Sequence, residues 1–210
     1  MGKKLLLIGG GGHCRSVLDS VLAANAYDGF GIIDPDGSPC LGIPVIGQDE
    51  DLPRLFSEGW TDAVITVGSI GDTGTRRRLY ETAKAIGFRL PAVIDPTAVI
   101  GKDAVLGEGT FVGKRAVVNA GARTGACAIV NTGAIVEHDC VIGDFAHIST
   151  GAILCGQVTV GNDAHIGAGT TVRQSIRIGD GALVGVGSTA VKDIPAGAKA
   201  YGNPCRVVEA

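Results

Sequence analysis

A repeat of six residues runs through the second half of the chain and constrains its fold more than any other feature. Written in sixes from Ile94, the sequence continues through sixteen hexads to Thr189 without an insertion. Position one is Ile, Leu or Val in fifteen hexads, position two is Gly in nine, and position five is Ala in ten. A fixed period of this kind predicts a solenoid whose aliphatic residues stack into one continuous core.

The composition fits such a core. Only 4% of the residues are aromatic, whereas 34 are glycine and 45% are hydrophobic. We expect three hexads to close one triangular coil of 18 residues, so that the repeat supplies a little over five coils. We interpret glycine at position two as a turn residue that needs a positive φ, and the small residue at position five as one that fits inside the bend.

The first part of the chain follows a different pattern. Aliphatic segments predict strands at 4–8, 29–33 and 62–68, and apolar residues at helical spacing predict helices over 13–25 and 73–87. Alternating strands and helices predict a small parallel sheet.

A run of four glycines, Gly9–Gly12, joins the first predicted strand to the first predicted helix, as a phosphate-binding loop does. The dinucleotide pattern G-x-G-x-x-G fails, because Cys14 stands at its third glycine. Asp34 ends the next strand, where a ribose-binding acid belongs. Since the chain is also too short for a dinucleotide domain and a catalytic one, we reject NAD and predict another nucleotide.

Glu137, His138 and Asp139 form the one hexad in which a histidine lies between two acids. A carboxylate beside an imidazole fixes its tautomer and raises its basicity, which suits a general base. His147 and His165 share position six and lie 18 residues apart, so they should stack one coil apart. His138 lies nine residues from His147 and should be on another side of the prism, which favours sites completed by a neighbouring subunit.

Several classes of function are disfavoured. The net charge is −3 without a run of like charges, so nothing points to nucleic acid, and no apolar segment approaches the roughly 18 residues of a membrane span. The six cysteines form no C-x-x-C pair and the histidines share no three-residue column, so no metal site is expected. We interpret the cysteines as reduced thiols of a cytoplasmic protein.

The segments VEHDCVIGDFAHIS and GNPCRVV, together with the earlier GGGGH, resemble one family across the whole chain. It comprises two-domain hexapeptide-repeat sugar acyltransferases of bacterial surface-glycan synthesis: sialic-acid O-acetyltransferases and nucleotide-linked aminosugar N-acetyltransferases. The resemblance implies a small Rossmann-like parallel-sheet domain at 1–92 that binds the nucleotide sugar. It further implies a left-handed parallel β-helix of hexapeptide repeats at 93–190 and a C-terminal tail at 191–210 covering the last coil.

The resemblance also implies roles for individual residues. His138 would be the catalytic base, Asp139 would enhance its basicity, and Glu137 would complete the acidic surroundings. Residues expected to contact acetyl-CoA are His147 and, by their place in the repeat, Gly156, Ala168 and Val186. Residues expected to hold the nucleotide sugar are Gly11, Gly12, His13, Asp34 and Gly68. Pro35 stands where relatives often carry a second acid, which leaves the nucleotide open.

The predicted activity is acetyl-CoA-dependent N-acetylation of a nucleotide-linked amino sugar by direct transfer, without a metal. No His or Lys is placed by spacing to activate Cys140 or Cys155, which disfavours an acyl-cysteine intermediate. One alternative is O-acetylation of sialic acid or another glycan precursor, for which Glu137 would matter more because a hydroxyl needs a stronger base. Another is a non-catalytic nucleotide-sugar-binding scaffold. A homotrimer is expected, since threefold packing of triangular prisms is closed.

Overall fold

A computed structural model describes residues 2–209, which form two compact units. The first unit contains the residues up to Ser69 together with Thr73–Pro96, and the second contains Ile70–Asp72 and the chain from Thr97 onward. The division after Pro96 lies four residues beyond the boundary expected from the sequence.

The first unit is built on a parallel sheet of four strands in the order β3-β2-β1-β4. The strands are β1 (Lys4–Ile8), β2 (Gly29–Ile33), β3 (Val45–Gly47) and β4 (Asp62–Ile65). Residues Leu5–Ile8 are all fully buried although neighbouring side chains point to opposite faces of the sheet. Both faces of β1 are therefore covered, which explains why this strand is a continuous aliphatic run.

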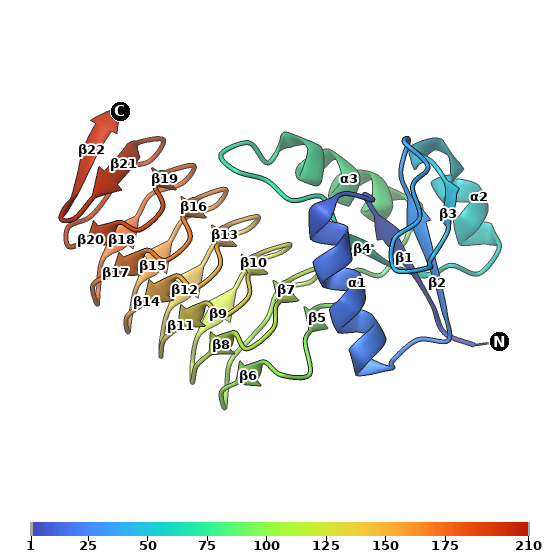
Figure 1. The fold of residues 1–210 in the computed structure, drawn as a ribbon, viewed down its shortest axis with the longest axis horizontal. Coiled ribbons are helices and arrows are strands. Elements are labelled where there is room, and N and C mark those ends of the chain that lie inside the picture. The colour runs from blue at the N-terminus through green and yellow to red at the C-terminus, as the bar shows by residue number, and fades with distance from the viewer. Residues whose placement is uncertain (1, 210) are drawn as a thin grey trace. The chain divides into compact units, whose positions relative to one another are not determined.

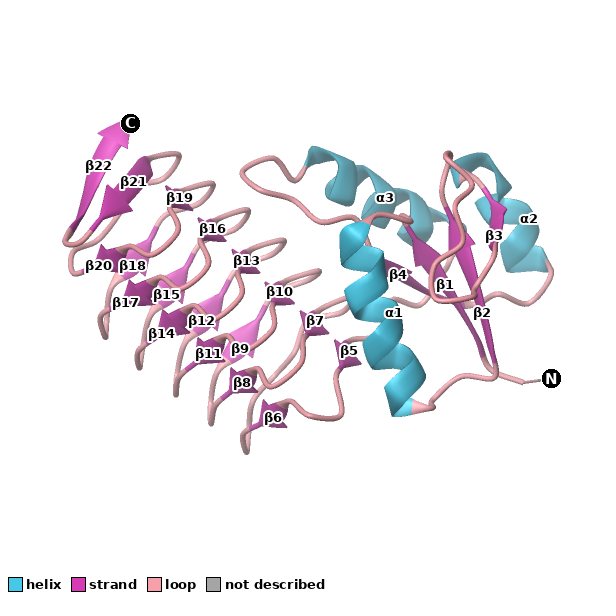
Figure 2. Ribbon diagram, viewed as in Figure 1, coloured by secondary structure: helices cyan, strands magenta, loops and turns pink. Residues whose placement is uncertain are grey.

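Three helices accompany this sheet (Figure 2). They are α1 (Gly12–Ala24), α2 (Leu52–Ser57), which follows the 3₁₀ turn η1 (Asp49–Asp51), and α3 (Gly74–Ile86). Gly87 ends α3 with a φ of 109°, a conformation that favours glycine. Strand β5 (Val93–Ile94) is the last element of the unit. The expected strands and the helices α1 and α3 are confirmed, whereas β3, η1 and α2 were not predicted because three to six residues show too little periodicity.

The second unit is a parallel β-helix whose strands stack coil upon coil, from green to red in Figure 1. The histidine sheet contains β7 (Phe111–Val112), β10 (Ile129–Val130), β13 (His147–Ile148), β16 (His165–Ile166) and β19 (Leu183–Val184). The valine sheet contains β6 (Val99–Ile100), β8 (Val117–Val118), β11 (Ile135–Val136), β14 (Ile153–Leu154), β17 (Thr171–Val172) and β20 (Thr189–Ala190). The arginine sheet contains β9 (Arg123–Thr124), β12 (Val141–Ile142), β15 (Thr159–Val160) and β18 (Arg177–Ile178).

The core confirms the predicted roles of positions one and five. Val130, Ile148 and Ile166 at position one are fully buried, as are Ala146 and Ala152 at position five. Each strand pairs with the strand 18 residues later, as His147 does with His165. Three hexads therefore make one coil.

The interpretation of position two was wrong. Positive φ values fall at position four, for example 58° at Asp139 and 66° at Gly151, and not at the glycines of position two. Position two needs glycine for space: a Cβ at Gly143 would lie 2.5 Å from the Asn162 nitrogen in the next coil. Side chains are excluded there because the coils stack backbone on backbone.

The final coil is shorter than the others. Strand β21 (Lys199–Gly202) pairs with β19 at an offset of 16 residues, Leu183 opposite Lys199, and then turns back into the antiparallel strand β22 (Cys205–Glu209). Across residues 2–209, the structure contains no helix with the length and apolar character needed to cross a bilayer.

Candidate functional site

His138 lies at a corner of the β-helix, between β11 and β12. Residues 119–121, 137–139, 155–157 and 173–175 stack one coil apart here, and we call this column the His138 corner. Backbone hydrogen bonds hold the stack: the Gln157 N–H donates to the His138 carbonyl at 2.9 Å, and the Ser175 N–H to the Gly156 carbonyl at 3.0 Å. A rigid repeat thus fixes the backbone on which His138 is carried.

The His138 imidazole pairs with the carboxylate of Asp139, its neighbour in sequence. His138 Nδ1 lies 2.9 Å from Asp139 Oδ2, and both side chains are more than half exposed. The left-handed backbone at Asp139, with φ of 58°, lets two consecutive side chains meet at a turn. The carboxylate accepts a hydrogen bond from Nδ1–H, so Nε2 is left as the nitrogen that can take a proton.

Glu137 occupies a different place from the one its sequence neighbours indicate. Its Oε2 accepts a hydrogen bond from Asn119 Nδ2 at 2.9 Å and another from the His138 backbone N–H at 3.2 Å. Of the two flanking carboxylates, the structure brings Asp139 to the ring and Glu137 to the backbone of the corner.

Gly156 lies one coil beyond His138 in the same column, against the imidazole. Within residues 2–209, no group accepts a hydrogen bond from its N–H. Beside it, Cys155, Arg173, Gln174 and Ser175 line a hollow of about 530 Å³. The corner therefore combines a proton acceptor, an available N–H donor and open space.

His147 and His165 stack on the outward face of the histidine sheet, as predicted. Their ring centroids lie 4.9 Å apart in a T-shaped arrangement. His147 Nε2 lies 3.2 Å from Asn131 Nδ2, and His165 Nε2 lies 3.3 Å from Ser149 Oγ. His165 is only 7% exposed, and this burial lowers its pKa. His138 belongs to another side of the prism, which confirms the prediction from the nine-residue spacing.

Ala168 and Val186 lie at a second corner, which follows the histidine sheet and consists of residues 149–151, 167–169 and 185–187; we call it the Val186 corner. The Gly187 N–H donates to the Ala168 carbonyl at 2.9 Å, and Val186 is 78% exposed. Among the described residues, none accepts a hydrogen bond from the N–H of Ala168 or Val186. The structure thus groups Ala168 with Val186 and leaves Gly156 at the other corner.

The glycine loop of the first unit leaves an open helix N-terminus. Gly11 is the N-cap of α1 without a side-chain cap, and the first turn carries no acid. A Cβ at Gly11 or Gly12 would meet nothing within 4 Å, so packing does not require glycine at either position. The free N–H groups and the helix dipole make this end a suitable site for an anionic group.

Asp34 braces this loop. Its Oδ2 accepts a hydrogen bond from the Gly10 N–H at 2.6 Å, and its Oδ1 accepts one from the Asp36 N–H at 3.0 Å. The sequence reading missed Gly10, where a Cβ would lie 2.8 Å from the Asp34 carboxylate. Gly68 adjoins His13, since a Cβ at Gly68 would lie 3.3 Å from His13 Cβ.

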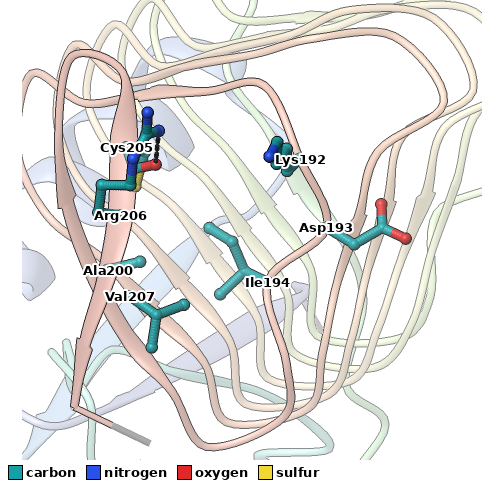
Figure 3. Close-up of a pocket in the computed structure, with 7 residues that line it drawn as sticks. All are labelled: Lys192, Asp193, Ile194, Ala200, Cys205, Arg206 and Val207. Atoms are coloured by element: carbon teal, nitrogen blue, oxygen red, sulfur yellow. Dashed lines mark hydrogen bonds between the residues drawn. The ribbon is translucent and has the colours of Figure 1, made fainter.

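A further hollow of about 180 Å³ lies at the last coil (Figure 3). It is lined by Lys192, Asp193, Ile194, Ala200, Cys205, Arg206 and Val207. Arg206 Nη1 donates a hydrogen bond to the Cys205 carbonyl at 3.0 Å. The sequence gave no indication of this hollow, because residues from 190 onward leave the hexad pattern.

Two other kinds of chemistry were tested against the geometry. In the part of the chain that the structure describes, no three His, Cys, Asp or Glu side chains gather closely enough to hold a metal ion. Burial raises the pKa of the Cys140 thiol to about 11, and its Sγ donates to the Cys155 carbonyl at 3.2 Å. A protonated thiol of this kind is a poor nucleophile.

Comparison with known proteins places these features in a family. The PglD N-terminal domain matches residues 4–83, and the bacterial transferase hexapeptide (six repeats) matches residues 139–174. No curated protein sequence matches the chain. The acetyltransferase domain of PglB from Neisseria gonorrhoeae is 37% identical with a TM-score of 0.93, over 98% of this chain and 100% of that one.

Two more solved structures agree. PerB from Caulobacter crescentus, in complex with CoA and GDP-perosamine, is 36% identical with a TM-score of 0.92, over 97% of this chain and 96% of that one. WeeI from Acinetobacter baumannii is 25% identical with a TM-score of 0.86, over 98% and 100%. The chain belongs to the hexapeptide-repeat sugar N-acetyltransferases. This N-acetyltransferase accordingly has the left-handed β-helix of that family, which confirms the predicted fold and enzyme class.

Proposed function

We propose that this N-acetyltransferase transfers the acetyl group of acetyl-CoA to the amino group of a nucleotide-linked amino sugar, with His138 as the general base. The observation that carries the proposal is the His138–Asp139 pair, in which Nδ1 is held at 2.9 Å and Nε2 is left to accept a proton. A binding scaffold has no need of a histidine oriented in this way.

The transfer proceeds in one displacement. His138 Nε2 takes a proton from the amine as its nitrogen attacks the thioester carbon. The Gly156 N–H, which has no acceptor among the described residues, donates to the developing oxyanion. The carbon–sulfur bond then breaks, and the imidazolium returns its proton to the departing CoA thiolate. The high pKa of the Cys140 thiol favours this direct route over an acyl-cysteine.

The Val186 corner is proposed as the binding surface for acetyl-CoA. His147 lies in the strand that enters this corner, and the N–H groups of Ala168 and Val186 are available as donors to the amide carbonyls of an extended pantetheine arm. The acetyltransferase domain of gonococcal PglB has been solved with acetyl coenzyme A, and PerB with CoA.

The nucleotide is proposed to bind at the glycine loop. The open N-terminus of α1 at Gly11 and Gly12 favours a phosphate, and His13, Asp34 and Gly68 surround it. PerB was solved with GDP-perosamine, a nucleotide-linked sugar.

A homotrimer is proposed because it brings the two corners together. The valine sheet lies between the Val186 corner and the His138 corner along the chain, as in the order β13, β14, β12 around one coil. Its outward residues carry no charge: Val99, Val117, Ile135, Ile153, Thr171 and Thr189. Three such sheets facing a common axis would place the His138 corner of one subunit beside the Val186 corner of the next. Six free cysteines accord with a cytoplasmic protein.

The test is a thiol-release assay with acetyl-CoA and a panel of UDP-, GDP- and dTDP-linked 4-amino sugars, comparing wild type with His138→Ala. We expect thiol release with one amino sugar and a loss of roughly a hundredfold or more in the variant. Binding of the nucleotide sugar, measured by calorimetry, should be unchanged.

Other outcomes are equally informative. Turnover only with free or CMP-linked sialic acid would move the acceptor from nitrogen to oxygen. An inactive wild type that still binds a nucleotide sugar would contradict the enzymatic proposal and support a scaffold.

A further inference from the structure

One glycine of the β-helix stands where the repeat otherwise carries a side chain. Position three of the sixteen hexads is occupied by Pro, Lys, Glu, Ala, Thr, His, Asp, Asn, Gln and Val, and by glycine only at Gly156. The backbone does not demand glycine there, because Gly156 is not among the residues with positive φ. The missing side chain therefore needs another reason.

The space that a side chain at 156 would fill is taken by the His138 imidazole. A Cβ built on Gly156 would lie 2.6 Å from His138 Cε1 and 3.1 Å from Cδ2, and it would meet Nε2. No Cβ tolerates such distances, so the ring rests on the bare backbone of the next coil.

Gly121 does the same for Asp139 from the preceding coil. A Cβ on Gly121 would lie 2.6 Å from Asp139 Oδ1. Gly121 has a φ of 71°, yet Gln157 and Ser175 adopt left-handed values of 62° and 58° at the equivalent place in the same corner. Conformation alone therefore does not select glycine at 121, whereas the contact with Asp139 does.

The remaining glycines of the repeat behave differently. Those of position two face backbone atoms of the next coil, as Gly143 faces Asn162, so they keep the coils stacked. Gly133, Gly169 and Gly181 at position four have nothing within 4 Å of a built Cβ. Among the described hexads, only Gly121 and Gly156 face the His138–Asp139 pair.

We propose that Gly121 and Gly156 are positioning residues that clamp the His138–Asp139 pair from the two neighbouring coils. This inference rests on the proposed role of His138 as the base. The clamp keeps Asp139 Oδ2 on Nδ1, and it holds Nε2 over the bare backbone at Gly156, where no side chain competes with the acceptor amine.

A methyl group at either position should affect activity more than folding. The atoms in its way are the ends of two side chains, which can swing aside at little cost, whereas a backbone obstacle cannot. When the imidazole or the carboxylate moves, the Nδ1–Oδ2 hydrogen bond is lost and the base leaves its place.

The experiment compares Gly156→Ala and Gly121→Ala with Gly181→Ala, which has a φ of 64° and open space and thus carries the same backbone strain as Gly121→Ala without the contact. For each protein we would measure the melting temperature, kcat, the affinity for acetyl-CoA and the side-chain nitrogen-15 signals of its four histidines. The nitrogen signals report the tautomer directly.

We expect kcat to fall roughly a hundredfold in both clamp variants, with the acetyl-CoA affinity retained. The His138 signals should change from the Nδ1–H tautomer to a mixture. Gly181→Ala should keep both kcat and the His138 signals.

Three results would overturn the clamp: wild-type kcat in both variants, lost kcat with unchanged His138 signals, or an equal loss in Gly181→Ala. The histidine signals separate this inference from the proposed function. If His138→Ala itself were fully active, the base assignment would fail, whereas the tautomer change in the glycine variants would still show whether the clamp exists.

Discussion

At the scale of single residues, the His138 corner shows how a monotonous repeat can carry chemistry. Consecutive side chains of a strand point to opposite faces, but position four of each hexad has a left-handed backbone, with φ of 58° at Asp139. The turn folds the carboxylate back onto the preceding imidazole. A histidine–carboxylate pair therefore needs no residue distant in sequence.

The two acids beside His138 should differ in their effect. We predict that Asp139→Ala lowers kcat roughly a hundredfold, because the imidazole loses its orienting partner. Glu137→Gln should lower it much less, since a glutamine oxygen can still accept from Asn119 and from the His138 N–H. Steady-state kinetics on both variants, with melting temperatures as a control for folding, provide the check. Equal losses in both variants would mean that Glu137 acts on the ring.

His165 should make stability depend on pH. Burial lowers its pKa in the folded chain relative to the unfolded one, so its contribution to stability is complete above the unfolded pKa and is lost as the pH falls through the folded value. We predict that the fall in melting temperature between about pH 7 and pH 5 is smaller in His165→Gln than in wild type. Calorimetry at several pH values measures this, and parallel curves for the two proteins would contradict it.

The sequence predicted the identity of the dyad but not its surroundings. The acid–His–acid triplet is visible as a break in the repeat, and the 18-residue spacing correctly stacked His147 on His165. Contacts such as Gly10 with Asp34, 24 residues apart, depend on where strands end and on side-chain rotamers, which no local pattern records. The same holds for Asn119, which lies one coil from Glu137.

At the scale of the element, the coil is the unit that the sequence predicted most completely. Its length, its inward aliphatic residues and its small fifth position all follow from the hexad pattern. What composition could not reveal was why glycine occurs at each place. Position two needs glycine for close stacking and position four tolerates it for its φ, and only coordinates distinguish the two reasons.

Glycine at position two should therefore be required for stability. We predict that Gly143→Ala destabilises the protein by about 1 to 3 kcal/mol, because a methyl group would strike the backbone of Gly161 and Asn162. Gly156→Ala serves as the matched control, since it faces only a movable ring and should keep its melting temperature. Thermal unfolding by circular dichroism compares them. A lower melting temperature for Gly156→Ala than for Gly143→Ala would refute this ranking.

The elements that escaped the sequence reading are short or irregular. Strand β3 and helix α2 are too brief for a period to appear, and the final coil closes with 16 residues in place of 18. The hairpin β21–β22 then continues the histidine sheet with residues that show no hexad pattern.

At the scale of the whole molecule, the uncharged outward face of the valine sheet is the feature with the widest consequence. Ile153 on this sheet is 37% exposed, and Val99 is 59% exposed. Apolar rows on a flat sheet are typical of surfaces that meet another subunit.

We predict that Ile153→Lys disrupts the trimer and abolishes acetyl transfer, because a charge would be buried at the subunit contact. Light scattering after size exclusion should give three times 21.2 kDa for wild type and a lower mass for the variant. Val141→Lys, 47% exposed on the arginine sheet, is the control and should leave the mass unchanged. A wild-type chain that elutes as a monomer with full activity would refute the arrangement.

The constant offset between paired strands gives the β-helix something like a reading frame. Deleting one residue would turn core positions outward, and deleting six would preserve the core but move every later corner to the next edge of the prism. His147 and Val186 would then be displaced relative to His138, although each hexad remained intact. Only a deletion or insertion of 18 residues keeps all three edges in phase. Insertions and deletions tolerated within this repeat should therefore come as whole coils.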